Sequence, residues 1–182
     1  DTSTNDTLCI MASGEAGNAL IDRTDTEYKK FCRALHEVTT AMCKKIAADG
    51  EGATKLIECT VRGAKSKQVA RTVAKSVVCS NLLKAAIFGA DANWGRVLCA
   101  IGYSGAAVDV NKIGVAFVSA AGKIEVCEDG RGIDFSEAAA KKILFEKEIG
   151  IEIELHDGNY SSVGWGCDLT YEYVHINGDY RS

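Results

Sequence analysis

The sequence has no proline in 182 residues, although proteins use about 5% on average. Its 18 glycines therefore have to supply most of the turns. No apolar run approaches the roughly 18 residues that span a bilayer, and the first residues lack the basic and apolar segments of a signal peptide. The net charge of −4 gives no electrostatic footprint for nucleic acid. We therefore expect a cytoplasmic protein that binds neither membrane nor nucleic acid.

Metal-binding patterns and familiar nucleophile motifs are also missing. The three histidines have no second ligand at a metal-like spacing, and no CxxC pair occurs. The segment "GYSG" does not match a nucleophile elbow. The eight cysteines are scattered singly, mostly inside apolar runs. This pattern predicts free, buried thiols in a reducing compartment and no metal site.

Hydrophobic periodicity predicts a mixture of helices and strands. Apolar residues recur every three or four positions from Tyr28 to Ile46, which indicates a long helix with Asp25 as its N-cap. Further helices are predicted over 64–80, 93–101 and 136–150, the last with Asp134 as a cap. Strands are predicted over 7–11, 55–63, 84–88, 112–119, 123–130, 150–158 and 166–177. The pattern indicates an α+β fold, with helices packed on a mixed sheet.

Two glycine-marked segments are candidates for chemistry. In "ADGEGATK", glycines flank Glu51, whose carboxylate could pair with an ammonium group; the other reading is a helix end with exposed acids. In "GADANWGR", Trp94 and Arg96 could contact a ligand, or the segment could start a helix capped by Asp91 or Asn93. The residues alone favour the structural reading of both segments.

Five segments taken in order point to a known family. They are "DTSTNDT", "DGEGATKLIE", "KAAIFGADANWGR", "AIGYSG" and "WGCDLTYEYVHINGDYRS". Together they resemble the β-chain of the ornithine acetyltransferases, the bifunctional glutamate N-acetyltransferases of arginine biosynthesis, from Asp1 to Ser182. The resemblance implies that residues 1–55 form part of a catalytic core domain shared with an α-chain. It also implies that residues 56–182 form a C-terminal α+β domain.

The resemblance implies a chemistry whose nucleophile lies outside this chain. In the family a precursor cleaves itself before a threonine, which then carries the acetyl group from N-acetylornithine to glutamate. The stretch resembling "DTSTNDT" lies inside the family's β-chain, so Thr2, Thr4 and Thr7 are not the nucleophile, and we expect no catalytic residue here. We expect the chain to lack its first β segment and to act with that segment and the α-chain in an α2β2 heterotetramer.

Three substrate contacts follow from the resemblance, position by position. Glu51 matches the family's substrate-binding glutamate, and Asn177 and Ser182 match its C-terminal asparagine and threonine. Because of this match, we interpret the Glu51 loop as a substrate-binding loop rather than as a helix end with exposed acids. The chain departs from the family pattern at Ala92, where proline is usual, and at Ser182, where serine keeps the hydroxyl.

The resemblance implies no resident cofactor or metal, although acetyl-CoA could serve as a co-substrate. The expected small-molecule ligands are N-acetylornithine, ornithine and glutamate. The alternative function is a noncatalytic amino-acid-binding or scaffold module derived from the same family. Transfer of acetyl from N-acetylornithine to glutamate by the assembled protein would distinguish the two.

Overall fold

The computed structural model describes residues 7–179, and the chain divides between Cys43 and Lys44 into two compact units. Helix α1 (Thr26–Ala48) passes through this division. Its N-cap is Asp25, as predicted, because Asp25 Oδ1 accepts a 2.6 Å hydrogen bond from the Tyr28 backbone amide. The apolar stripe of α1 stays exposed within this chain: Phe31 and Val38 are 54% and 57% accessible. The predicted division into residues 1–55 and 56–182 stays a prediction.

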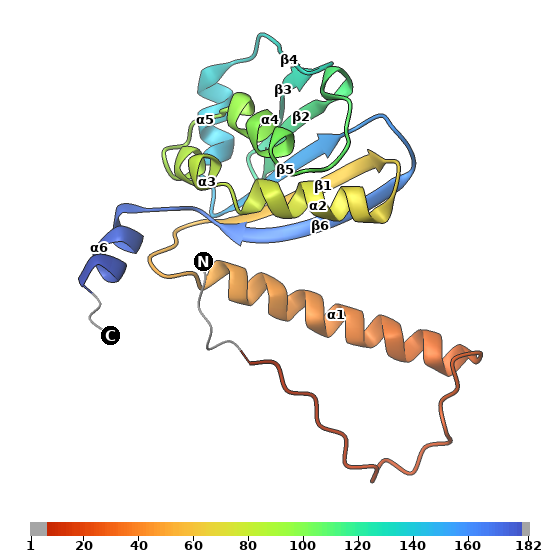
Figure 1. Cartoon of the computed structure of the whole chain (residues 1–182). Helices are drawn as coiled ribbons and strands as arrows, with labels where there is room; N and C mark the ends of the chain where they lie inside the picture. The colour runs from red at the N-terminus through yellow and green to blue at the C-terminus, as the bar shows by residue number, and fades with distance from the viewer. Residues whose placement is uncertain (1–6, 180–182) are drawn as a thin grey trace. The chain divides into compact units, whose positions relative to one another are not determined.

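The second unit is built on one mixed sheet of six strands (Figure 1), which confirms the α+β class. The strand order is β4-β3-β2-β5-β1-β6. β1 pairs in parallel with β5, whereas the other neighbours are antiparallel. The strands are β1 (Leu56–Ala64), β2 (Gly114–Ser119), β3 (Gly122–Glu128), β4 (Arg131–Gly132), β5 (Glu148–Glu154) and β6 (Tyr160–Cys167).

Four helices cover one face of this sheet (Figure 1): α2 (Lys67–Val78), α3 (Asn81–Phe88), α4 (Trp94–Gly102) and α5 (Glu137–Leu144). Their N-caps are Ser66, Ser80, Asn93 and Ser136, whose side chains each accept a backbone N–H from the first turn. Three predictions about these helices were wrong. Residues 84–88 lie in α3 rather than in a strand, and Ser136 rather than Asp134 caps α5. The helix predicted over 136–150 ends at Leu144, and residues 148–150 belong to β5.

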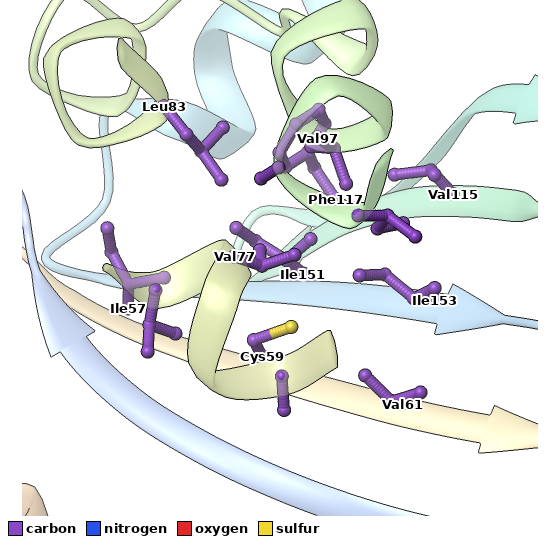
Figure 2. Packing of buried hydrophobic residues seen from close by; sticks show 14 of the residues in the cluster. Ile57, Cys59, Val61, Val77, Leu83, Val97, Val115, Phe117, Ile151 and Ile153 are labelled. Carbon is purple, nitrogen blue, oxygen red and sulfur yellow. The ribbon is translucent and has the colours of Figure 1, made fainter. Parts of the chain in front are cut away.

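The core lies between these helices and the sheet. Alternate residues of β1 point into it, and Ile57, Cys59 and Val61 are fully buried (Figure 2). Phe117 of β2 and Ile151 of β5 are fully buried beside them. The same alternation in β5 is the signal from which that strand was predicted.

The opposite face of the sheet carries charged side chains. The Glu152 carboxylate of β5 accepts a hydrogen bond from Lys123 Nζ of β3 at 2.8 Å and lies 3.3 Å from an Arg62 guanidinium nitrogen of β1. Hydrogen bonding by Lys123 lowers the pKa of Glu152; partial burial opposes this, and Arg62 adds to it. The Glu152 carboxylate of β5 thus links β3 on one side to β1 on the other.

The C-terminal part differs most from the sequence prediction. Residues 166–177 were expected to form the last strand, but β6 ends at Cys167 and a helix, α6, covers Tyr171–Asp179. The strand predicted over residues 7–11 is absent from the structure as well. In residues 7–179 no helix is both long enough and apolar enough to cross a membrane.

All eight cysteines are free thiols, as predicted, but burial was predicted too broadly. Three are buried, namely Cys59, Cys127 and Cys167, and the other five are exposed. Burial strongly raises the pKa of the Cys59 thiol. Cys59 is therefore an inert core residue in this fold.

Candidate functional site

Two segments distant in sequence meet at one end of the sheet. The loop of residues 49–55 leads from α1 into β1, and residues 168–170 lead from β6 into α6. Because β1 and β6 are antiparallel with Leu56 opposite Cys167, the start of β1 and the end of β6 lie together. The register of this strand pair therefore brings the Glu51 loop to α6.

The two predicted site residues that the structure describes are in direct contact. The Asn177 side-chain amide donates a 2.7 Å hydrogen bond to Glu51 Oε2. Both side chains are exposed within this chain. The third predicted residue, Ser182, lies outside the described residues. The structure thus brings Glu51 and Asn177 into one polar site.

The orientation of the Asn177 amide decides what it can offer to a ligand. Its nitrogen also donates to the Tyr173 backbone carbonyl at 2.9 Å, one helical turn earlier. The two amide hydrogens are thus directed to Glu51 and Tyr173, which leaves Asn177 Oδ1 as the atom available to a ligand. The Glu51 carboxylate is also an acceptor. The pair therefore favours a donor group such as an ammonium.

Glycines allow the loop to approach the C-terminal segment closely. Gly52 has a φ of +66°, and a Cβ atom there would lie 2.9 Å from Glu172 Cβ and 2.9 Å from the Tyr173 nitrogen. A Cβ atom on Gly50 would lie 2.6 Å from Cys167 Sγ. Side chains at these positions would push the two segments apart. Gly52, which follows Glu51, is thus a geometric requirement of the site.

Lys55 ties the end of the loop to the core. Its ammonium donates to the Ile87 carbonyl at 2.6 Å and lies 3.4 Å from the Phe88 carbonyl, at the C-terminal end of α3. Desolvation by burial lowers the pKa of Lys55, and the nearby Asp168 carboxylate opposes this shift. The residues after Glu51 are therefore fixed to a helix as well as to a strand.

Sequence reasoning missed two polar residues of this region, Asp168 and Thr170. Asp168 accepts hydrogen bonds from the Thr54 and Lys55 backbone amides at 2.8 and 3.0 Å, and Thr170 Oγ1 donates to the Gly52 carbonyl at 2.7 Å. Both are buried. Their partners are more than 110 positions away in the sequence, so no local signal could have shown these roles.

The "GADANWGR" segment has the structural role that the sequence favoured, as the start of a capped helix. Asn93 Oδ1 accepts the Arg96 backbone amide at 3.1 Å and caps α4. Trp94 packs on the core, and a Cβ atom on Gly132 would fall 2.4 Å from its ring. Ala92 is buried in this turn. These residues are therefore accounted for by packing.

Two hollows lie away from the Glu51–Asn177 pair. One of about 410 Å³ is lined by Glu58, Val118 and Glu148 among others, and one of about 270 Å³ by Arg62, Glu125 and Glu152 among others. Neither lining includes Glu51 or Asn177. We place the candidate site at the pair because it joins the two residues that the family resemblance matches to substrate contacts. Within residues 7–179, no three potential ligands gather as a metal site requires.

Comparisons with known proteins identify the family that this chain resembles. The profile of the ArgJ family matches residues 1–182. The "Arginine biosynthesis bifunctional protein ArgJ 1" of Clostridium acetobutylicum is 52% identical over the whole chain, which spans 45% of that relative. The ArgJ protein of Thermotoga neapolitana is 51% identical, and the chain spans 46% of it. The chain therefore covers less than half the length of these curated relatives.

A solved structure matches the fold. The crystal structure of the arginine biosynthesis bifunctional protein ArgJ from Bacillus halodurans superposes with a TM-score of 0.91 at 46% sequence identity. The match covers 99% of this chain and 83% of that one.

Proposed function

Because the chain belongs to the ArgJ family, we propose that it is part of an acetyltransferase of arginine biosynthesis. The reaction proposed for the assembled enzyme is transfer of the acetyl group from N-acetylornithine to glutamate. The relatives are named bifunctional, and we propose acetyl-CoA as a second acetyl donor. This chain supplies a substrate-binding wall, and a threonine outside it supplies the nucleophile.

The proposed transfer is a two-step covalent reaction. The threonine hydroxyl oxygen attacks the acetyl carbonyl of N-acetylornithine, the carbonyl–nitrogen bond breaks, and ornithine leaves with the hydroxyl proton. The glutamate amine then attacks the acetyl-threonine ester and forms N-acetylglutamate. The proton lost by that amine returns to the threonine oxygen. Donors on the α-chain stabilise the oxyanion in each step.

The observation that carries the proposal is the 2.7 Å contact between the Asn177 amide and the Glu51 carboxylate. The acceptors of this pair suit the ammonium group of an ornithine-type substrate, which a hydrogen-bonded carboxylate binds well. The pair is exposed within this chain. Such exposure suits one side of a substrate site whose other side belongs to another chain. Ser182 would add a hydroxyl to the same wall.

The remaining assignments follow from the same resemblance. We propose that self-cleavage of a precursor produces the α- and β-chains and that these assemble as an α2β2 heterotetramer in the cytoplasm. The enzyme would need no metal and no resident cofactor. The α-chain and an N-terminal β segment would complete the site.

The test is a transfer assay on the complete natural protein that contains this chain. We expect N-acetylglutamate to form from N-acetylornithine and glutamate, and a chain with a new N-terminal threonine to gain one acetyl group during turnover by intact-mass spectrometry. Ornithine binding without any transfer, in protein with every chain present, would instead show an amino-acid-binding module.

A further inference from the structure

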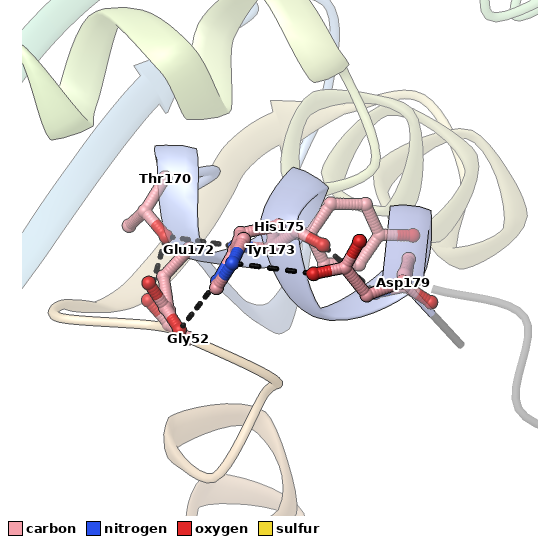
Figure 3. Close-up of polar contacts among 7 residues, drawn as sticks. Gly52, Thr170, Glu172, Tyr173, His175 and Asp179 are labelled. Carbon is pink, nitrogen blue, oxygen red and sulfur yellow. Dashed lines mark hydrogen bonds and ion pairs between the residues drawn. The ribbon is translucent and has the colours of Figure 1, made fainter.

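Thr170 makes two contacts that join α6 to the loop carrying Glu51 (Figure 3). Its hydroxyl donates to the Gly52 backbone carbonyl at 2.7 Å. The same oxygen accepts the Tyr173 backbone amide at 3.3 Å, as an N-cap does for the first turn of a helix. One side chain thus starts α6 and fixes it to the residue that follows Glu51.

Neighbouring contacts hold both ends of this junction in place. The Asp168 carboxylate accepts the Thr54 hydroxyl at 2.5 Å as well as the Thr54 and Lys55 backbone amides. On the other side, the Tyr171 ring meets the Phe88 ring edge to face, with centroids 5.6 Å apart. Further contacts therefore hold the segments on both sides of Thr170.

Beyond this junction α6 lies at the surface of the chain. None of its residues is buried, and Tyr171 and Val174 are 85% and 64% exposed. The contacts of His175 with the Glu172 and Asp179 side chains are within the helix and do not attach it to the sheet. The Thr170 junction and the Asn177–Glu51 hydrogen bond are therefore two contacts that set the direction of α6.

A small change of direction at Thr170 has a large effect at Asn177. The intervening helix is about 10 Å long, so a tilt of about 20° would move Asn177 by about 3–4 Å and break its hydrogen bond to Glu51. We propose that Thr170 is a positioning residue for the substrate site, because its hydroxyl ties α6 to the Gly52 turn and so holds Asn177 against Glu51. The kinetic consequence of this role rests on the proposed function.

The first test compares two substitutions in the assembled natural enzyme. Thr170→Val keeps the shape of the side chain and removes both hydrogen bonds, whereas Thr170→Ser keeps the hydroxyl. We expect Thr170→Val to raise the KM for N-acetylornithine at least about tenfold with kcat within about threefold, because contacts equal in ground and transition states are weakened. Thr170→Ser should stay within about threefold of the natural KM. An unchanged KM in Thr170→Val would overturn the proposal.

A double-mutant cycle tests whether Thr170 acts through Asn177. Asn177→Ala removes the side chain that Thr170 is proposed to place. If the proposal holds, adding Thr170→Val to Asn177→Ala changes KM little further, because the two effects share one contact. An equal rise in KM in both backgrounds would show that Thr170 acts elsewhere, for example through general stability.

Hydrogen exchange gives a readout that is independent of activity. In Thr170→Val the backbone amides of residues 171–179 should exchange faster than in the natural protein, and in Thr170→Ser they should not. Unchanged exchange in Thr170→Val would overturn the positioning role. Faster exchange in an assembled protein that transfers no acetyl group would leave that role standing and reject the proposed function instead.

Discussion

Glu51 and Asn177 are 126 positions apart in the sequence, yet the Asn177 side-chain amide donates a 2.7 Å hydrogen bond to the Glu51 carboxylate. The contact follows from the antiparallel pairing of β1 and β6. This pairing places the loop that precedes β1, which carries Glu51, beside helix α6, which follows β6. A local motif and a distant C-terminal segment thus form one site through strand pairing.

Glu51→Gln should weaken substrate use by the assembled enzyme while preserving the fold. Gln keeps the shape but cannot offer a charged acceptor to an ammonium, so we expect kcat/KM to fall by about 10–100-fold, equivalent to roughly 1.5–3 kcal/mol for a hydrogen bond to a charged group. The melting temperature should be nearly unchanged, because Glu51 is exposed. Steady-state kinetics with N-acetylornithine measures the loss.

Asp49→Asn is the matched control, since Asp49 is an exposed acid of the same loop. It should leave kcat/KM within about twofold. Equal losses in the two variants would show a general effect of loop charge and would remove Glu51 from the site.

Deleting residues 177–182 should impair activity more than stability. The deletion removes Asn177 and the last residues of α6, and residues 177–179 are not buried. We expect kcat/KM to fall at least about tenfold, and the free energy of unfolding to change by less than about 1 kcal/mol. Deleting only residues 180–182 measures how much of the loss in kcat/KM comes from that segment, which includes Ser182. A truncated protein that fails to fold would show that the tail is structural.

Gly52→Ala should move α6 away from the Glu51 loop. An alanine there would have a left-handed backbone conformation and a Cβ atom 2.9 Å from Glu172 Cβ, at a cost of about 1–3 kcal/mol. We expect faster amide exchange over 171–179 together with a higher KM. Gly102→Ala, where a Cβ atom meets nothing within 4 Å, should leave both unchanged, and similar behaviour of the two variants would contradict the close packing at Gly52.

The stability that Glu152 contributes should depend on pH in the acid range. Its pKa is lowered in the folded state from an ordinary value of 4.5, chiefly by Lys123. The contribution is therefore fully present above about pH 4.5 and is lost as the pH falls through the lower folded-state pKa. Urea unfolding should show the gap between the natural protein and Glu152→Gln shrinking from pH 7 to pH 3.

This gap should be no more than about 1 kcal/mol, since the Lys123 and Arg62 side chains are about half exposed. Glu125→Gln, at an exposed position of β3, is the control for a change of net charge. A gap between the natural protein and Glu152→Gln that stays constant with pH would show that the Glu152 contacts do not form in solution.

The parts of the fold that were predicted from sequence have local signals. Alternation in β1 and β5, and the helical spacing from Tyr28 to Ile46, are visible without any partner. The short, mostly apolar run before Gly89 is not decisive by itself, because a short apolar run suits a helix or a strand. Ser80, which caps α3, decides for the helix.

α6 shows why the rest was not predictable. "TYEYVHIN" is rich in aromatic and β-branched residues that favour strands, yet it begins a helix because Thr170 caps it and Phe88 and Gly52 pack against its first turn. Those contacts come from elsewhere in the chain. The assignment of Glu51 and Asn177 to a substrate site came only from the resemblance to a family, since neither residue type is diagnostic alone.

The pairing of β1 with β6 also limits how this protein can vary in length. An extra two residues inside β6 would shift the segment after that strand by about 7 Å, which separates Asn177 from Glu51, and a single extra residue would turn Cys167 out of the core. The connection over 155–159 joins β5 to β6 at the opposite end of the sheet. Length changes between Tyr160 and Asn177 should therefore separate Asn177 from Glu51, whereas length changes in the 155–159 connection would disturb the packing of Leu155 and leave that pair in register.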